Sequence, residues 1–255
     1  MSRSLETQPL LSVNRLCKHF IVHNRDGKKI EGFAKASFDV PKGSVLALSG
    51  SSGIGKSSVL KCIYRTYLPS SGSVVYRSRM YGTVDLAALS EYRILQLRAF
   101  EIGYATQFLK ILPRVPALEV VAEPLLDGKT SPARARTEAR RILGRLNIPA
   151  ALFDAYPVTF SGGEQQRINI ARAVVARPRL LLLDEPIASL DEASIDAVID
   201  LLSELRDLGT TMVIVSHNSK ILESLANQVY RLPAKPNQIT PCEADRLDAG
   251  ASHAG

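Results

Sequence analysis

The eight residues GSSGIGKS, from Gly50 to Ser57, constrain the fold more than any other part of this sequence. They satisfy the pattern G-x-x-x-x-G-K-[S/T], come directly after the apolar segment SVLALS, and open a segment with helical periodicity. Glycines in such a loop permit the torsions that turn successive N–H groups toward a polyphosphate, and the helix N-terminus behind them adds partial positive charge. The loop therefore predicts a strand, a phosphate-binding turn and a helix of an α/β protein.

The same loop indicates the chemistry of its ligand. Lys56 supplies the positive charge that a triphosphate needs, and the Ser57 hydroxyl is a suitable ligand for a Mg²⁺ ion bridging the β- and γ-phosphates. We expect the whole loop and the residue after it to contact the nucleotide. These predicted contacts are Gly50, Ser51, Ser52, Gly53, Ile54, Gly55, Lys56, Ser57 and Ser58.

A second motif, LLLLDEP, places Asp184 and Glu185 at the end of an apolar strand. In an open parallel sheet, ligands bind at the carboxyl ends of the strands. Asp184 is predicted to hold Mg²⁺ through water, and Glu185 to orient or deprotonate the attacking water. Two carboxylates at a strand end can also be ordinary helix caps, but the phosphate loop favours the functional interpretation.

A third motif, FSGGEQQR at residues 160–167, has two interpretations. Ser161 and Glu164 have the spacing of a capping box at a helix N-terminus. Two glycines in that first turn cost helix stability of roughly 1 kcal/mol each, which is hard to explain unless a backbone or ligand must approach closely. An exposed helix N-terminus with a serine hydroxyl is also an anion site.

Hydrophobic periodicity predicts an α/β core that is interrupted by a helical block. Right-handed β-α-β crossovers and a largely parallel sheet follow from the alternation of strands and helices. Predicted strands are 36–40, 44–49, 73–76, 180–183 and 212–215; predicted helices begin near 57, 132 and 161 and cover 192–208; 69–72 is a turn. Predicted parts are an N-terminal β part with the phosphate-loop core (1–92), a helical subdomain (93–158), the rest of the core (159–232) and a disordered tail (233–255).

Composition excludes several classes of protein. The longest apolar runs are far shorter than a membrane span, and the N-terminus has no apolar core of secretory length, so we expect a cytoplasmic protein. Three distant cysteines suit neither a disulfide framework nor a close-spaced zinc site. Between Arg93 and Arg145, ten basic residues stand against five acidic ones, which is either a solvated helical surface or a docking face for a partner.

The ordered set of motifs resembles the nucleotide-binding domain of the ATP-binding cassette (ABC) family, over about Leu11 to Leu232. The resemblance implies an ABC-type P-loop fold with an N-terminal antiparallel β part, a mostly parallel sheet and an inserted helical subdomain. It also assigns ATP as the nucleotide and gives four more residues a role. Phe20 would stack on adenine, Gln107 would bind the metal and link it to the helical block, Asp191 would form the D-loop, and His217 would contact the γ-phosphate.

Family resemblance further implies that two such domains meet head to tail. Ser161, Gly162 and Gly163 of one chain, together with Glu164, would face the ATP held by Lys56 of the other chain. The second chain would be a copy of this one or a sister cassette protein. Glu164, Ile187 and Phe20 depart from the commonest family residues, but none of these changes removes a phosphate or metal ligand.

The segment GYATQFLKILPRVPALEVVAEPLL, residues 103–126, resembles one branch of the family, the cassette subunits of the bacterial carbon–phosphorus lyase system. That implies a soluble subunit that assists ribose 1-phosphonate 5-triphosphate synthesis, or remodels the complex, beside the lyase core subunits. One alternative is the energy-coupling subunit of an inner-membrane transporter, of the lipoprotein-release or macrolide-export type. Another is a module that clamps ATP without useful turnover.

Overall fold

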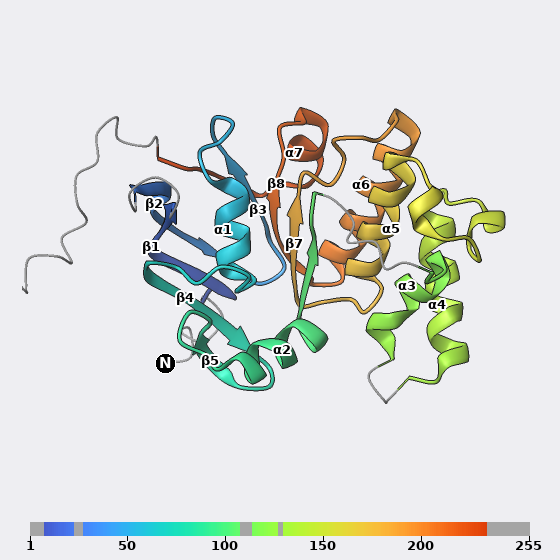
Figure 1. Cartoon of the computed structure of the whole chain (residues 1–255), viewed down its shortest axis with the longest axis horizontal. Coiled ribbons are helices and arrows are strands. Elements are labelled where there is room, and N and C mark those ends of the chain that lie inside the picture. Colours follow the sequence, from blue (N-terminus) through green and yellow to red (C-terminus); the bar gives the residue numbers. More distant parts are fainter. Residues whose placement is uncertain (1–7, 23–27, 108–113, 127–129, 234–255) are drawn as a thin grey trace, which may run out of the picture.

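The computed structural model describes residues 8–22, 28–107, 114–126 and 130–233. Two β-sheets and a group of helices are arranged side by side, and the sheets enclose the first helix (Figure 1). The predicted tail, 233–255, lies outside the described residues apart from its first residue. Within the described part of the chain, no helix is long and apolar enough to cross a membrane.

The central sheet is parallel and has the order β6-β7-β8-β3-β9. Its strands are β3 (Val45–Ser49), β6 (Ile102–Ala105), β7 (Leu180–Asp184), β8 (Thr211–Val215) and β9 (Gln228–Arg231). Every residue of β7 and β8 is buried, as expected for a parallel sheet covered on both faces. The predicted parallel α/β core is therefore confirmed.

Alternate residues of β7 face opposite sides of this sheet, because side chains in a strand alternate. Leu180 and Leu182 belong to the core around α1 (Lys56–Ile63), whereas Leu181 and Leu183 belong to the core around α5 (Gly162–Val174) and α6 (Glu192–Asp207). The all-apolar sequence of β7 thus supplies two separate cores. This double burial fixes Asp184, at the end of the strand, in the middle of the molecule.

The second sheet is antiparallel, with the order β2-β1-β4-β5. Its strands are β1 (Leu11–Val22), β2 (Lys28–Val40), β4 (Ser71–Ser78) and β5 (Gly82–Asp85). Leu11, Phe33 and Tyr76 of this sheet share a buried core with Leu60 of α1 and Leu48 of β3. Helix α1 is thereby packed between the two sheets, and the predicted antiparallel N-terminal part is confirmed.

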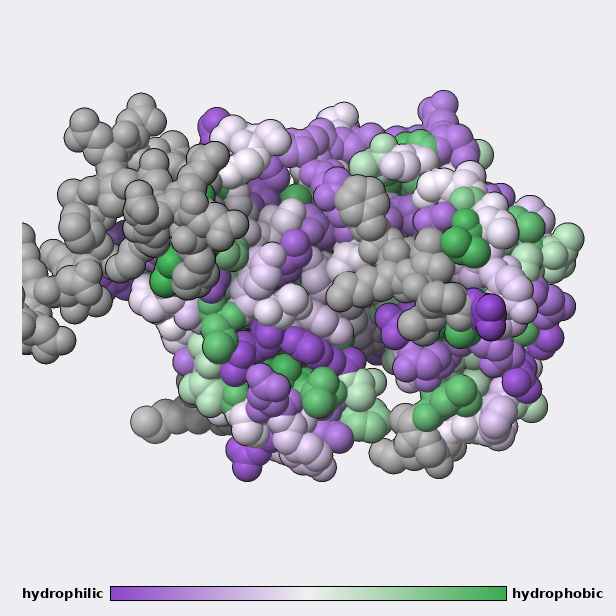
Figure 2. All heavy atoms as spheres, in the orientation of Figure 1, coloured by the Kyte–Doolittle hydropathy of each residue, from purple (hydrophilic) through white to green (hydrophobic). Residues whose placement is uncertain are grey.

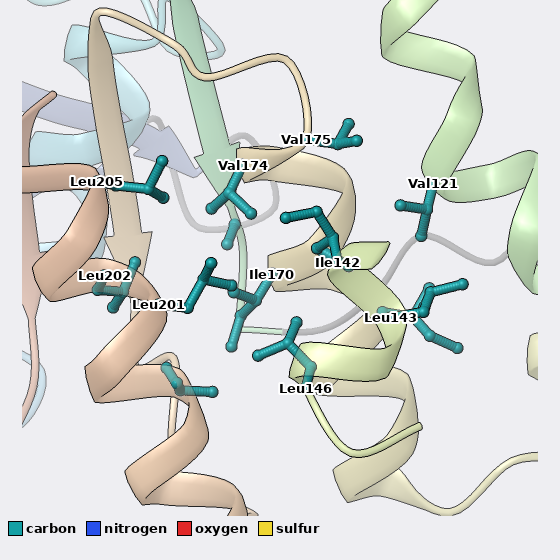
Figure 3. Packing of buried hydrophobic residues seen from close by; sticks show 14 of the residues in the cluster. Val121, Ile142, Leu143, Leu146, Ile170, Val174, Val175, Leu201, Leu202 and Leu205 are labelled. Carbon is teal, nitrogen blue, oxygen red and sulfur yellow. The ribbon is translucent and has the colours of Figure 1, made fainter. Parts of the chain in front are cut away.

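Helices α3 to α6 form the other end of the molecule. They are α3 (Ala117–Ala122), α4 (Pro132–Arg145), α5 (Gly162–Val174) and α6 (Glu192–Asp207), while α2 (Glu91–Phe100) and α7 (Ser219–Leu225) lie on the sheet side. Val121, Leu143, Ile170 and Leu202 meet in one apolar core (Figure 3). The predicted N-cap of α4 is confirmed, since Ser131 accepts a hydrogen bond from the Arg134 N–H, with Pro132 at the first helical position.

Two sequence predictions differ from the structure. Strand β6 lies at residues 102–105, where only helix and irregular structure were expected, so this part of the predicted helical subdomain belongs to the central sheet. The predicted turn at 69–72 extends only to Ser70, because Ser71 already pairs with Cys17 across a bulge of β1. Both differences come from pairing with strands distant in sequence, which local periodicity does not report.

Part of the basic charge between Arg93 and Arg145 is paired with carboxylates on the helix surface. Arg136 pairs with Glu119 at 2.7 Å, and Arg141 pairs with Glu138 at 3.0 Å. In the space-filling view, hydrophobic residues form separate patches among hydrophilic ones, including a patch over α2 (Figure 2). On α2, the side chains of Tyr92 and Leu95 are 70% and 58% exposed.

Candidate nucleotide-binding site

Loops at the carboxyl ends of β3, β7 and β8 surround a cleft of about 930 Å³. This is the place where a parallel sheet binds its ligands. Ten of the predicted site residues line the cleft: Phe20, Ser52, Gly53, Gly55, Lys56, Ser57, Ser58, Gln107, Glu185 and His217. The fold therefore brings together residues that are up to about two hundred positions apart in the sequence.

The phosphate loop carries the conformations that its glycines were predicted to supply. Gly50, Gly53 and Gly55 all have positive φ angles, and Gly55 is the N-cap of α1. Among the described residues, no side chain caps this helix. Its first backbone N–H groups therefore have no capping side chain as an acceptor. A helix start with this geometry is suited to a polyphosphate.

Lys56 is almost fully buried and its ammonium group is held inside the loop. Its Nζ donates to the carbonyl oxygens of Gly50 at 2.8 Å and Ser51 at 3.1 Å. Burial lowers the pKa of Lys56, and the charges of Glu185 and Asp184 act against that shift. A bound phosphate close to Lys56 would likewise raise its pKa and favour the charged form of the lysine.

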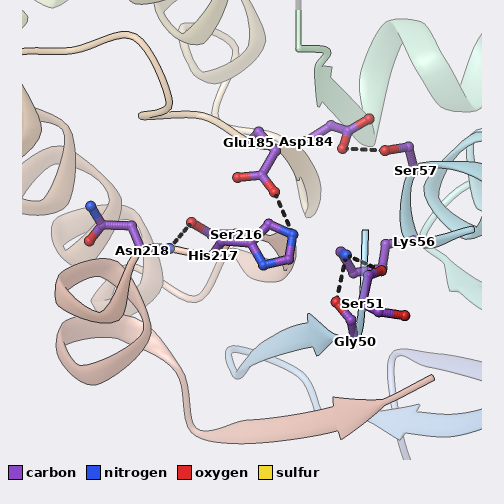
Figure 4. Close-up of polar contacts among 9 residues, drawn as sticks. All are labelled: Gly50, Ser51, Lys56, Ser57, Asp184, Glu185, Ser216, His217 and Asn218. Carbon is purple, nitrogen blue, oxygen red and sulfur yellow. Dashed lines mark hydrogen bonds and ion pairs between the residues drawn. The ribbon is translucent and has the colours of Figure 1, made fainter. Parts of the chain in front are cut away.

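Ser57 and Asp184 form the polar centre of the site (Figure 4). The Ser57 hydroxyl donates to Asp184 Oδ1 at 2.8 Å, and the Tyr104 hydroxyl donates to Asp184 Oδ2 at 3.3 Å. Burial raises the pKa of Asp184, against the hydrogen bond from Ser57 and the nearby lysines. Hydroxyl and carboxylate oxygens at this spacing are the donors that Mg²⁺ prefers, so these residues fit the predicted metal.

Glu185 and His217 lie at the opposite wall of the cleft. The Glu185 backbone adopts φ +50°, a left-handed conformation that is uncommon for a non-glycine residue, and its N–H donates to the Val215 carbonyl at 2.8 Å. Glu185 Oε1 is 3.6 Å from His217 Nε2 (Figure 4). Burial raises the pKa of Glu185, while the imidazole and the backbone N–H of His217 lower it.

Gln107 lines the cleft two residues after the end of β6. The preceding carbonyl, that of Thr106, accepts a hydrogen bond of 2.5 Å from Asn169 Nδ2. Asn169 is buried in α5, the helix that begins at the glycines of the third motif. The residue before Gln107 is thus tied directly to that helix.

Phe20 also lines the cleft. Its ring packs edge-on against Tyr67, with centroids 5.3 Å apart, and the Lys18 ammonium is 5.2 Å from its centroid. Gly32 leaves room for this ring, because a Cβ there would be 2.7 Å from Phe20 Cε2. An aromatic ring on the wall of the cleft fits the predicted stacking on a base.

The third motif lies apart from this cleft. Ser161, Gly162, Gly163 and Glu164 do not line it, and neither does Asp191. The predicted capping box is present: the Ser161 N–H donates to Glu164 Oε2 at 2.8 Å, and the Glu164 N–H donates to Ser161 Oγ at 3.3 Å. Asp191 caps α6 by accepting from the Ser194 N–H at 2.9 Å.

Four other predicted residues lie just behind the cleft. Gly50 and Ser51 contact Lys56, Ile54 is buried against Gly50, and Asp184 is buried behind Ser57. Sequence reasoning missed Tyr104 and Asn169, which position Asp184 and the approach to Gln107. Strand β6 was not predicted, so no signal in the sequence brought Tyr104 to Asp184.

Comparison with known proteins shows which family and fold the chain resembles. The chain is similar to the dimeric bacterial ABC transporter cassette MJ0796, with 25% identity, a TM-score of 0.79, and coverage of 87% of this chain and 94% of that one. The post-hydrolysis dimer of that cassette, bound to ADP and Pi, matches equally well. The chain is also similar to cbiO1 from Clostridium perfringens, part of the ABC transporter complex cbiONQ, with 25% identity, a TM-score of 0.68, and coverage of 88% and 85%.

Residues 33–188, more than half of the chain, match the ABC transporter family. This region contains the whole phosphate loop, the third motif, Asp184 and Glu185. The two sheets and the helical region have the arrangement of ABC cassette structures. The chain therefore belongs to the ABC transporter family and is an ABC-type ATPase cassette.

Proposed function

We propose that this cassette binds MgATP and hydrolyses it at a head-to-tail interface between two cassette chains. One observation carries the proposal: the phosphate loop, Gln107, Glu185 and His217 meet at one cleft, whereas the third motif and Asp191 do not line it, and Ser161 and Gly162 lie exposed at the start of α5. A site completed by a second chain accounts for this separation. The similar cassette MJ0796 is a dimer, which supports the same arrangement.

Binding of ATP would use the phosphate loop and Phe20. The triphosphate would replace the carbonyl oxygens of Gly50 and Ser51 as the partner of Lys56, since a full negative charge is a stronger acceptor. The loop N–H groups and the start of α1 would hold the phosphate oxygens. Phe20 would stack on the adenine.

Ser57, Asp184 and Gln107 would hold Mg²⁺, the last two at the ends of neighbouring strands. When bound, Mg²⁺ would neutralise negative charge on the β- and γ-phosphate oxygens. Tyr104 would orient Asp184 through its hydrogen bond. Through its hydrogen bond to the Thr106 carbonyl, Asn169 would couple a movement of Gln107 to α5, whose N-terminus carries the third motif.

Glu185 is the group we assign as general base. It would take a proton from the water whose oxygen attacks the γ-phosphorus, while the bond to the β,γ-bridging oxygen breaks and ADP leaves. Burial raises the pKa of Glu185, which makes it a better proton acceptor than an exposed carboxylate. His217, 3.6 Å away, would contact the γ-phosphate.

Substitution of Glu185 by Gln tests this assignment. We expect retained ATP binding, turnover reduced at least about a hundredfold, and an ATP-trapped dimer detectable by gel filtration. Glu192→Gln is the matched control, because Glu192 is exposed in the first turn of α6 and outside the cleft. Unchanged turnover in Glu185→Gln would contradict the role of Glu185.

We propose that the cassette serves the carbon–phosphorus lyase machinery, as the sequence of residues 103–126 suggests. Its cassette partner would be a second copy or a sister protein, beside the lyase core subunits. The second candidate is the ATP-binding subunit of an inner-membrane transporter, which is favoured by the similarity to two transporter cassettes.

Affinity purification of the tagged chain from its native cells separates these two partners. Lyase subunits in a detergent-free extract would support the first proposal. Recovery of a permease after detergent extraction, without lyase subunits, would contradict it and favour the second. The Glu185→Gln chain is the preferred bait, because a trapped ATP dimer holds its partners longer.

A further inference from the structure

A second cavity, of about 300 Å³, lies at the amino ends of the parallel strands. Its lining includes residues that come shortly before three strands: Lys42, three residues before β3, Arg177–Arg179 before β7, and Gly209 and Thr210 before β8. The nucleotide cleft follows the carboxyl ends of the same strands. The two cavities are therefore at opposite ends of the central sheet and have no lining residue in common.

The amino-end cavity has an excess of positive charge. Four cationic side chains line it, from Lys42, Arg79, Arg177 and Arg179, against the one carboxylate of Glu101. Within the described residues, no ion pair joins any of these cations to a carboxylate. This net charge of three positive attracts an anion.

The carboxylate of Glu101 is fully engaged by neutral donors and does not compete for the cations. It is buried, and it accepts from the Tyr76 hydroxyl at 2.8 Å and the Ser78 hydroxyl at 2.9 Å. The backbone N–H groups of Arg79 and Met80 donate to it at 2.9 and 3.0 Å. The cations are consequently available to a ligand.

Arg179 provides the sharpest sign of a missing acceptor. Its Nε atom is buried and has no hydrogen-bond partner among the described residues. The Arg179 backbone is fixed at the start of β7, because its N–H donates to the Glu101 carbonyl at 2.9 Å and its carbonyl accepts from Thr211 at 3.0 Å. A buried donor that lacks an acceptor is costly, so a ligand oxygen that reached Arg179 would remove this cost.

The remaining wall of the cavity is apolar. It is formed by Phe100, Pro178, Leu205 and Leu208, and Phe100 and Leu208 are 40% and 62% exposed. The cavity volume is at the lower limit of small-molecule sites. Its chemistry therefore suits a small ligand that has an anionic group at one end and an apolar group at the other.

We propose that this cavity binds a small organic phosphate, whose dianionic phosphoryl group contacts Arg179 and the three rim cations while its apolar part lies against Leu208 and Phe100. A phosphoryl group offers several acceptor oxygens, which the guanidinium fork of Arg179 can engage through two N–H groups. The ligand leaves the nucleotide cleft free, since the cavities are separate. The site does not depend on which partner the cassette serves.

Calorimetric titration of the full chain with phenyl phosphate tests the site, with MgADP present at saturation so that the phosphate loop is filled. We expect saturable binding of one phenyl phosphate per chain, and weaker binding of inorganic phosphate and of benzyl alcohol. Arg179→Gln should weaken phenyl phosphate binding at least about tenfold, the loss expected for one charge-assisted hydrogen bond. Arg140→Gln removes the same charge from an exposed position on α4 and should change the affinity less than about twofold.

Lys42→Gln is a second test, because Lys42 is exposed and its substitution leaves the packing intact. It should weaken binding less than Arg179→Gln and more than Arg140→Gln. Absence of saturable binding, or equal losses in Arg179→Gln and Arg140→Gln, would overturn the proposal. Sedimentation with vesicles that contain phosphatidic acid, abolished by Arg179→Gln, would identify a lipid headgroup as the source of the phosphoryl group and overturn a soluble ligand.

Discussion

Two helix starts in this chain are rich in glycine, but for different reasons. At the start of α1, Gly55 has φ +111°, and a Cβ added to it would lie 2.2 Å from the Gly32 carbonyl oxygen. At the start of α5, Gly162 has an ordinary φ, and a Cβ added to it would meet nothing within 4 Å. The chain's own packing requires the first glycine and has no use for the second.

The two helix starts also differ in capping, and here α5 is the one that the chain's own residues satisfy. Helix α1 has no side-chain cap among the described residues, whereas Ser161 and Glu164 form a capping box at the start of α5. The α1 terminus thus has no capping side chain and is suited to an anion, while the α5 terminus has its own cap and still exposes Ser161 and Gly162. A glycine that the fold does not need, on an exposed turn, indicates close approach by something outside the chain, and a second cassette with its ATP fits that description.

Gly55→Ala gives the largest expected effect. The left-handed conformation and the clash with the Gly32 backbone together should lower the free energy of unfolding by at least about 3 kcal/mol, measured by urea denaturation. Gly53→Ala is the matched control, because Gly53 has φ +73° but an added Cβ there meets nothing within 4 Å. It should cost only about 1 kcal/mol. Equal losses would show that the contact with β2 is unimportant.

Gly162→Ala should separate stability from function. The unfolding free energy should stay constant or rise by up to about 1 kcal/mol, since alanine is the better helix residue and fits the space. ATP binding by the single chain should be retained, while ATP-dependent dimerisation and turnover fall about tenfold or more. Gly144→Ala on α4, also with open space around the added Cβ, should give the same stability without loss of turnover. Normal turnover in Gly162→Ala would place the interface elsewhere.

The sequence predicted the parts of the site that local pattern determines. Glycine spacing predicted the loop, an apolar run predicted β7 and the position of Asp184, and Ser161-x-x-Glu164 predicted the capping box. Each of these depends on residues within a few positions of one another. The order of the motifs then identified the family, which the comparisons confirmed.

The features that were missed depend on contacts between distant segments. Tyr104 meets Asp184 only because β6 pairs with β7, and Asn169 reaches Thr106 only because α5 packs beside β6. The amino-end cavity likewise gathers Lys42, Arg79 and Arg179 from three separated segments. Hydrophobic periodicity reports which face of an element is buried but does not report its neighbour, so these contacts required the structure.

Glu164→Gln gives the smallest effect and addresses the capped terminus itself. Hydrogen bonds from the Ser161 hydroxyl and from the Ser161 N–H hold the pKa of Glu164 below its ordinary value of 4.5. The folded chain therefore binds this proton less readily than the unfolded chain does. The stability that the charge contributes is complete above pH 4.5 and is lost as the pH falls through the lower pKa of the folded state.

Glutamine can accept the same two hydrogen bonds but carries no charge, so the comparison isolates the charge at the helix start. At pH 7, the unfolding free energy measured in urea should be lower for Glu164→Gln than for the original chain. The difference should be at most a few tenths of a kcal/mol because Glu164 is well solvated, and the two values should converge toward pH 3.

The same substitution should affect dimerisation in the opposite direction, since a carboxylate three residues beyond Ser161 repels an approaching γ-phosphate. Glu164→Gln is therefore expected to strengthen the ATP-dependent dimer a few-fold at low ionic strength, with the gain disappearing in high salt. A weaker dimer at low salt would mean that the start of α5 does not face the phosphates.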